Sequence, residues 1–465
     1  MQDTRKERDF LGEVDVPANA YYGIGTKRAA DNFRISDMRF GRKFIWALGL
    51  IKKAAAETNL DLSIIEPKIG DAIVKAAKEV ADGHFDSQFI VDIFQSGSGT
   101  STHMNANEVI ANRANELLGT ALGGKGPVHP NDHVNMGQSS NDVIPTAIHI
   151  AALKQIDESL LPALEKLKSA LESKAMEFTE VVKAGRTHLQ DATPLTLGQE
   201  FGGYATQMDH GIRRIYSVRA SLSELAIGGT AVGTGLNAHP AFAQGVVVRL
   251  KRDTGLDLSE AHDHFEAQAS QDSLVEASAA MKTVAVSLMK IANDLRLLSS
   301  GPKAGLEEIN LPAVAPGSSM MPGKVNPVIP ESVCQVAAQV IGNDAAITVG
   351  GFNASLDLNT MMPLMAYNLM NSISLLANAS RTLAEKCVDG ITANVEKCRR
   401  HAETSPAIAT RLNSLVGYEK ASEIAIEAER TGKTVKQIAI ERKLLTPEEA
   451  EIALDPKRMA GSRSH

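Results

Sequence analysis

Residues 274–298 read LVEASAAMKTVAVSLMKIANDLRLL. Apolar side chains recur in this stretch at alternating steps of three and four, a spacing that places them along one face of a helix. The apolar positions are Leu274, Ala277, Met281, Val284, Leu288, Ile291, Leu295 and Leu298. The pattern stops before Gly301-Pro302, a pair that breaks helices. The sequence therefore predicts one long helix with a continuous apolar seam.

Four further stretches carry a seam of the same kind. They are residues 156–171, 201–225, 332–341 and 365–387. Pro162 lies inside the first of these and is expected to kink its helix. Alternating β-branched runs bounded by turn residues are sparse, so strands are not expected to shape the fold. We expect an all-α fold whose centre is a bundle of five long helices.

The helical pattern changes at two places along the chain. Before about Ser139 the expected helices are short and separated by polar, glycine-rich stretches. Beyond about Glu396 they shorten again, and residues 446–449 (TPEE) have the form of a capping box with proline at the first helical position. We expect an N-terminal helical domain (1–139), a central long-helix domain (140–395) and a small C-terminal helical domain (396–465).

Composition excludes several classes of function. The chain has 465 residues, of which 43% are hydrophobic, which is ample for a large buried core. A net charge of -7 and an aromatic content of 4% offer neither a basic surface nor stacking side chains for nucleic acid. The cysteines form no CxxC pair, and no apolar segment suits a signal peptide or a membrane span. We expect a cytoplasmic protein that binds neither nucleic acid nor membrane.

The residues richest in chemical function lie in one loop, residues 317–327, which reads GSSMMPGKVNP. Glycine and proline at this density favour special backbone angles over a helix. Lys324 and Asn326 supply the donors that a carboxylate requires. Ser318 is a candidate base, provided that the N–H groups of the loop and Lys324 lower the pKa of its hydroxyl. The alternative is that Ser318 and Ser319 only cap the loop.

Four further motifs accompany the loop in a fixed order. They read QSGSGT (95–100) with MNANE (104–108), HPNDHVN (129–135) with QSSND (138–142), GRTHLQD (185–191), and GGTAVGTGLN (228–237). Together with the loop, they resemble the motifs of the fumarase/aspartase superfamily of lyases, whose members add or eliminate small groups across the double bond of fumarate. The motif Lys-Val-Asn-Pro is similar to the one found in the branch of class II fumarases and aspartate ammonia-lyases.

The resemblance implies a role for each matched residue. Ser318 is the proton-abstracting residue, and His188 with Glu331 positions the water that becomes the hydroxyl of the product. The residues expected to bind a small dicarboxylate, fumarate or L-malate, are Ser98, Thr100, Ser139, Ser140, Asn141, Thr187, Lys324 and Asn326. Donors of these types stabilise the charge that develops when a C–H proton beside a carboxylate is removed. The alternatives are a structural hydrogen bond for His188 and a favourable helix-start charge for Glu331.

His129, Asn131 and Asp132 match a second carboxylate-binding site, which in fumarases lies near the entrance. Pro-Asn-Asp is also strong turn chemistry, which is the alternative role of this segment. An arginine found just upstream in some relatives is missing here, because Lys125 and Gly126 occupy that stretch. The resemblance therefore implies weak binding at this second site.

Metal binding finds no support in the sequence. His262-Asp263-His264 is the only tight His/Asp cluster, and nothing else at ligand spacing accompanies it. We expect no metal and no cofactor. The resemblance implies a homotetramer with a multi-helix core, whose active sites each draw residues from three subunits. Long apolar seams favour such self-association, although they also suit a core within one chain.

Three functions stay open. Fumarate hydratase, the reversible hydration of fumarate to L-malate in the tricarboxylic acid cycle, is favoured by Ser140, by residues 98–100 and by Gly350-Gly351. Aspartate ammonia-lyase, which converts L-aspartate to fumarate and ammonia, is favoured by residues 21–23 and 326–331. Met362 is typical of neither enzyme.

The third possibility is a non-catalytic structural relative, comparable to the lyases that became lens crystallins. It is disfavoured because Ser318, Lys324, Asn326, His188 and Glu331 are all intact.

Overall fold

The computed structural model describes residues 3–461, which pack into two compact units. Unit 1 contains the chain up to Leu161 together with Arg214–Lys282 and Gln339–Leu376. Unit 2 contains Pro162–Arg213, Thr283–Ala338 and the chain from Ala377 onward. Because the boundaries fall inside long helices, neither unit is a continuous stretch of sequence.

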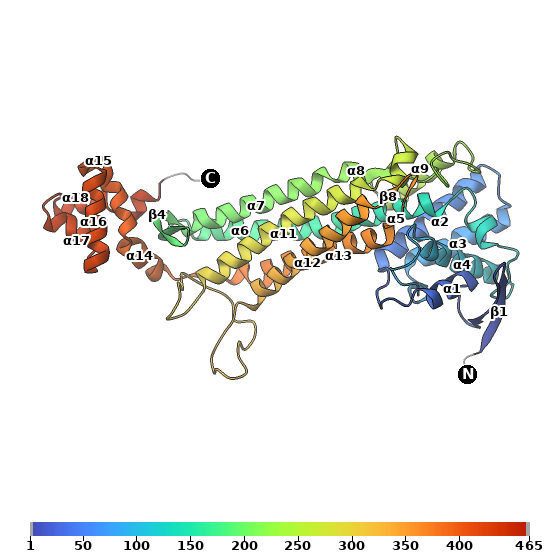
Figure 1. Ribbon diagram of the computed structural model, residues 1–465, viewed down its shortest axis with the longest axis horizontal. Helices are drawn as coiled ribbons and strands as arrows, with labels where there is room; N and C mark the ends of the chain where they lie inside the picture. Colours follow the sequence, from blue (N-terminus) through green and yellow to red (C-terminus); the bar gives the residue numbers. More distant parts are fainter. Residues whose placement is uncertain (1–2, 462–465) are drawn as a thin grey trace. The chain divides into compact units, whose positions relative to one another are not determined.

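Unit 1 is built mainly from helices, among which α2 packs on α3 (Figure 1). Its helices are α1 (Ile24–Asn32), α2 (Arg42–Asp61), α3 (Pro67–Asp82), α4 (Thr100–Leu117), α5 (Ser140–Gln155), α8 (Arg219–Ser223), α9 (Phe242–Thr254) and α10 (His264–Ala269). Its short helical turns are η1 (Asp86–Gln88), η2 (Pro130–Val134) and η3 (Ile156–Leu160). Its strands are β1 (Thr4–Asp9), β2 (Gly12–Pro17), β5 (Glu224–Leu225), β6 (Ser259–Glu260), β8 (Ala354–Ser355) and β9 (Leu358–Asn359).

Four long helices extend through both units: α7 (Leu197–Ser217), α11 (Asp272–Leu298), α12 (Val328–Phe352) and α13 (Met362–Lys386). In unit 2, α6 (Leu161–Glu177), α7 and α11 lie side by side (Figure 1). The other helices of unit 2 are α14 (Val395–Thr404), η4 (Val388–Gly390), η5 (Pro406–Leu412), α15 (Asn413–Val416), α16 (Tyr418–Thr431), α17 (Val435–Glu441), α18 (Pro447–Ala453) and α19 (Pro456–Met459). Its strands are β3 (Val182–Thr187), β4 (Gln190–Thr196), β7 (Ile309–Asn310) and β10 (Thr392–Ala393).

The five predicted seams correspond to long helices. In α11, the seam positions from Leu274 to Leu295 are 0% exposed, as the heptad spacing requires. The other seams correspond to α6, α7, α12 and α13. The prediction of a mostly helical fold around five long helices is confirmed.

One detail of the helix prediction needs correction. The seam of residues 201–225 is not one helix, because α7 ends at Ser217 and a separate short α8 and strand β5 follow. Pro162 is the second residue of α6, directly after the wide turn η3. A proline at this position cannot donate to the carbonyl four residues earlier, so the regular hydrogen-bond pattern is interrupted there.

The strands pair into five small sheets of two strands each within the described residues. The longest are the antiparallel hairpins β1–β2 and β3–β4, and a bulge interrupts the second between Ala184 and Gly185. The sequence did not predict the β3–β4 hairpin, which carries two candidate site residues.

The end of the chain has an apolar core of its own in unit 2. It includes Ile408, Leu412, Ile424 and Ile438. The predicted capping box is confirmed, because the Thr446 side chain accepts from the Glu449 N–H while the Glu449 side chain accepts from the Thr446 N–H. Between residues 3 and 461, no helix is both long and apolar enough to cross a membrane.

Candidate active site

The loop of residues 317–327 contains no helix or strand before α12, as predicted, and it closes on itself at its base. The Gly317 N–H donates to the Lys324 carbonyl at 2.7 Å, and the Asn326 side-chain amide donates back to the Gly317 carbonyl. A Cβ atom on Gly317 would lie 2.5 Å from the Lys324 carbonyl oxygen, so glycine is required for this approach. The segment between these anchors is therefore held at both ends.

Ser318 directly follows Gly317, at the point where the two ends of the loop are joined. Its Oγ accepts hydrogen bonds from the backbone N–H groups of Met320 at 3.1 Å and Met321 at 2.8 Å. Two donors that point at one oxygen stabilise its anionic form, which is what a serine base requires. The same two bonds also cap a turn, so the two roles that the sequence allows share one geometry.

The other charged and polar candidates near the loop have different surroundings. Lys324 is exposed. Asn326 is half-buried and already uses one amide N–H on the Gly317 carbonyl, which leaves its second N–H for another acceptor. Glu331 is half-buried in the first turn of α12, where its charge favours the helix start.

Thr187 and His188 lie at the tip of the β3–β4 hairpin. Thr187 is the last residue of β3, and His188 with Leu189 forms the two-residue turn. The φ angles of His188 and Leu189 are 57° and 61°, a combination that hairpins normally achieve with Asn-Gly. Bulky residues in this region cost on the order of 1 kcal/mol each, and such strain is concentrated at functional sites. The strained tip supports a functional role for exposed His188.

A buried ionic network fixes the base of this hairpin. Glu308 is 0% exposed and accepts two hydrogen bonds from Arg186, at 2.9 and 2.8 Å. Lys183 Nζ lies 3.4 Å and His401 Nδ1 2.9 Å from its carboxylate. Burial alone would raise the pKa of the Glu308 carboxyl, but these three partners outweigh it and hold the pKa below its ordinary value.

In unit 1, Ser98 and Thr100 lie at the start of α4. Their hydroxyl oxygens are 2.8 Å apart, so one O–H is used between them and the other is available to a ligand. Gly99 between them has a φ of 74°, a left-handed conformation that brings the two side chains together at the helix start. Backbone N–H groups at such a helix start also favour anions.

Ser139, Ser140 and Asn141 form the start of α5. Ser139 is the N-cap residue and takes part in a capping box with Asp142. The Asn141 amide donates to the Ala231 carbonyl at 2.7 Å. Ser140 is 9% exposed, and its Oγ lies 2.7 Å from His103 Nδ1.

Asp142 ties this helix start to the glycine-rich turn that follows β5. Its carboxylate accepts the N–H groups of Gly228 and Thr230, each at 3.0 Å. Burial raises the pKa of Asp142 to about 6, against the effect of these hydrogen bonds. A Cβ atom on Gly228 would lie 2.4 Å from the Ala243 Cβ, and the φ of Gly228 is 102°, so this tightly packed turn requires glycine.

Sequence reasoning missed two residues behind Ser140. Lys52 on α2 and His103 on α4 are 0% and 1% exposed, and Lys52 Nζ lies 2.6 Å from His103 Nε2. A signal was present: Lys52 is four residues from both Leu48 and Ala56, on the apolar stripe of its helix. A lysine on such a stripe is buried only when its N–H groups find partners.

The proposed second site has the geometry of a turn. The His129 ring Nδ1 accepts the backbone N–H groups of Asn131 and Asp132, each at 3.2 Å. Nδ1 is therefore an acceptor, and the ring proton of neutral His129 is on Nε2, where it can donate to a ligand. Asn131 and Asp132 are exposed.

The candidate residues thus fall into separate groups. Ser318, Lys324, Asn326 and Glu331 share one segment, whereas Thr187 and His188 lie on the hairpin tip. Among the described residues, no hydrogen bond or ion pair joins His188 to Glu331. The five donors of unit 1 and the three residues of the second site complete the set: Ser98, Thr100, Ser139, Ser140, Asn141, His129, Asn131 and Asp132.

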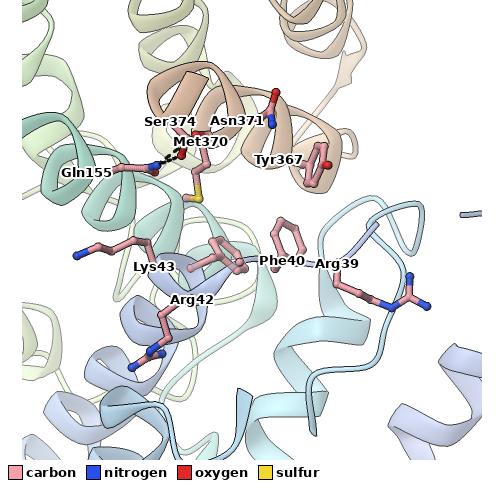
Figure 2. Close-up of a pocket in the computed structure, with 11 residues that line it drawn as sticks. Arg39, Phe40, Arg42, Lys43, Gln155, Tyr367, Met370, Asn371 and Ser374 are labelled. Carbon is pink, nitrogen blue, oxygen red and sulfur yellow. Dashed lines mark hydrogen bonds between the residues drawn. The ribbon is translucent and has the colours of Figure 1, made fainter. Parts of the chain in front are cut away.

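Two cavities lie outside these groups. One of about 280 Å³ in unit 1 is lined by residues that include Phe40, Gln155 and Tyr367 (Figure 2). The charged ends of Arg39, Arg42 and Lys43 point away from it (Figure 2), and Lys43 pairs with Glu158. The other, of about 630 Å³ in unit 2, lies between the hairpin tip and α16. Neither of the two is lined by a candidate residue.

Within residues 3–461, no group of three or more His, Cys, Asp or Glu side chains is arranged to hold a metal ion. The cluster at 262–264 has other contacts. Asp263 caps α10, and the His264 ring contacts the Ala226 carbonyl and Glu260, each at 3.0 Å.

Family models match most of the chain. A model described as a lyase matches residues 12–342, and one described as the fumarase C C-terminus matches residues 408–461. The chain is 55% identical to the class II fumarate hydratase of Halobacterium salinarum over 458 residues, which is 98% of this chain and 97% of that relative.

Solved structures agree over nearly the full length. The fumarate lyase:delta crystallin from Brucella melitensis bound to cobalt has 49% identity and a TM-score of 0.95, with 99% of this chain and 100% of that chain covered. The class II fumarase from Schistosoma mansoni has 39% identity and a TM-score of 0.96, with 98% and 99% covered. Since motifs, family models and fold all agree, this chain belongs to the class II fumarases of the fumarase/aspartase superfamily of lyases.

Proposed function

We propose that the protein is a fumarate hydratase that interconverts fumarate and L-malate. The observation that carries this proposal is the loop of residues 317–327, where two backbone N–H groups hold the Ser318 oxygen and the exposed Lys324 belongs to the same loop. The full-length similarity to class II fumarate hydratases supports hydration over loss of ammonia.

In the direction from malate, Ser318 removes the C3 proton next to the C4 carboxylate. The Met320 and Met321 N–H groups stabilise the serine oxygen anion that accepts this proton. The electron pair left on C3 spreads into the carboxylate, which becomes a dianion. Lys324 and the free N–H of Asn326 are suited to hold that charge.

The second half of the reaction expels the hydroxyl group. We assign His188 and Glu331 to this step, because a histidine with a carboxylate can hold a water and deliver a proton at neutral pH. The hydroxyl leaves C2 as water, and the electron pair on C3 forms the double bond of fumarate. Ser98, Thr100, Ser139, Ser140, Asn141 and Thr187 are assigned to the two carboxylates of the substrate.

A second, weaker carboxylate site is assigned to His129, Asn131 and Asp132. The His129 Nε2–H is the donor that supports it, since the Nδ1 side is used by the turn. Loss of this site is expected to leave turnover at the main site in place.

The assembly we propose is a cytoplasmic homotetramer with active sites shared by three subunits, three domains in each chain, and no metal or cofactor. Apolar side chains exposed on the long helices support association. Val286 on α11 is 54% exposed, and Val349 and Phe352 on α12 are 54% and 90% exposed.

The experiment that tests the function follows the ultraviolet absorbance of fumarate. The purified protein is mixed with L-malate and, separately, with L-aspartate. Fumarate is expected to appear from malate only. Appearance from aspartate only would make the protein an ammonia-lyase, and no appearance from either would favour a non-catalytic relative.

A further inference from the structure

A chain of buried polar groups runs behind Ser140, from α2 through α4 to the start of α5, all within unit 1. Lys52 Nζ lies 2.6 Å from His103 Nε2, and His103 Nδ1 lies 2.7 Å from Ser140 Oγ. Both side chains are almost wholly buried, at 0% and 1% exposure. Water cannot satisfy them, so their protonation follows from the protein groups around them.

Two amide oxygens complete the surroundings of Lys52. Gln138 Oε1 lies at 2.8 Å and Asn135 Oδ1 at 3.2 Å from Nζ. Both amides are fixed in orientation by their own N–H groups. Gln138 Nε2 donates to the carbonyls of Val134 and Met136, and Asn135 Nδ2 donates to the Gln138 carbonyl. Lys52 must therefore donate to both oxygens, and only its contact with His103 is variable.

That variable contact decides the tautomer of His103. A charged Lys52 donates its third N–H to Nε2, so the ring proton is on Nδ1 and donates to Ser140 Oγ. A neutral Lys52 instead accepts from Nε2–H, and the bare Nδ1 then accepts the Ser140 hydroxyl. In the first state Ser140 keeps its O–H for another acceptor. In the second state the O–H is already used.

We propose that charged Lys52 fixes the Nδ1–H tautomer of His103 and so keeps the Ser140 hydroxyl free to donate to a substrate carboxylate. This inference rests on the proposed function, in which Ser140 contacts the dicarboxylate. Lys52 and His103 are positioning residues, because they act on the substrate only through Ser140.

The charged groups that face this pair among the described residues are few. Burial lowers the pKa of Lys52 well below its ordinary range, and the Asp142 carboxylate on α5 opposes that shift. Burial and then the charge of Lys52 lower the pKa of His103, so the ring is neutral. Lys52 therefore loses its proton at a lower pH than a surface lysine, and the donor state of Ser140 is lost towards alkaline pH.

The first test is the pH dependence of KM for L-malate, with His103→Asn as the comparison. An asparagine amide can donate to Ser140 whatever the state of Lys52. As the pH rises from neutral to alkaline values, KM should rise about tenfold in the wild-type enzyme and less than about twofold in His103→Asn. A flat wild-type profile overturns the proposal, and this measurement does not require a Lys52 variant to fold.

The second test is a double-mutant cycle at neutral pH. Lys52→Met keeps the side-chain volume and removes the donor that fixes the ring. It should raise KM about tenfold in the wild-type background but less than about twofold in the His103→Asn background, with kcat within about threefold in both. Equal losses in the two backgrounds would assign Lys52 a purely structural role and overturn the proposal.

Ser140→Ala separates this inference from the proposed function. It should raise KM and abolish the alkaline rise. If Ser140→Ala turns over malate with wild-type KM, Ser140 does not bind the substrate, and the inference fails while fumarate hydration stands. If the wild-type protein does not turn over malate at all, both fail.

Discussion

At the scale of single residues, the base that we propose, Ser318, receives its hydrogen bonds from its own backbone. The two N–H groups that reach its oxygen come from the next turn of the same loop. This arrangement places the stabilising donors before substrate arrives, so no reorganisation is needed when the oxygen becomes charged.

Replacement of Ser318 by alanine tests this assignment directly. Ser318→Ala removes the base and should lower kcat for malate about 10²- to 10⁴-fold without a change in folding. The matched control is Ser319→Ala, the exposed neighbour in the same loop, which should retain activity within about threefold. Wild-type turnover by Ser318→Ala would assign the proton transfer to another group.

The sequence showed most candidate residues but not their partners. Ser318 and Lys324 were recognisable because a loop dense in glycine, serine and proline stood out from helical surroundings. Lys52 and His103 carry no motif, and the one signal for Lys52 is its place on an apolar helix stripe, which indicates burial but names no partner. Only the fold shows that Gln138 and Asn135 turn their oxygens towards Lys52.

At the scale of elements, the hairpin β3–β4 depends on the Glu308 carboxylate. Glu308→Gln leaves Arg186 without its counter-charge and Lys183 with Glu200 alone, and should reduce stability at neutral pH by about 3–5 kcal/mol. The exposed pair Glu385–Lys166 is the control, and Glu385→Gln should change stability by less than about 1 kcal/mol.

The stability difference between the wild-type protein and Glu308→Gln should also depend on pH. Because the pKa of Glu308 is lowered in the folded state, its stabilisation is present above the ordinary glutamate pKa and disappears as pH falls through the lowered value. In thermal unfolding, the gap between the wild-type protein and Glu308→Gln should therefore narrow from neutral pH towards about pH 3. A gap that stays constant would contradict a charge-based role for Glu308.

Helices were predictable from the sequence, whereas the hairpin was not. The seam of α11 repeats over the whole helix, so its periodicity could not be mistaken. Residues 182–196 alternate poorly, and the turn uses His188 and Leu189 where a hairpin signal would be Asn-Gly. The break between α7 and α8 was missed because apolar residues continue past Ser217 without glycine or proline.

At the scale of the whole molecule, the proposed sharing of active sites between subunits can be tested by mixing variants. In this proposal Ser318 and Ser140 of one active site come from different copies of the chain. Unfolding and refolding an equal mixture of Ser318→Ala and Ser140→Ala subunits should restore about a quarter of the sites.

At malate concentrations well below KM, where Ser140→Ala loses most of its activity, the activity of the mixture should therefore exceed that of either variant refolded alone. Hybrid formation is verified with differently tagged subunits, and native mass measurement gives the number of copies. Hybrid tetramers without any recovery would mean that both serines of a site belong to one chain.

The closed base of the 317–326 loop also matters for how such a protein changes over generations. Since Gly317 and Asn326 join the two ends of the loop, the residues between them can be exchanged without moving the start of α12. An evolving lineage can thus vary the side chains around Ser318 and Lys324 within this short loop while its helices keep their sequence. A combinatorial library confined to residues 319–323 would give protein engineers the same freedom.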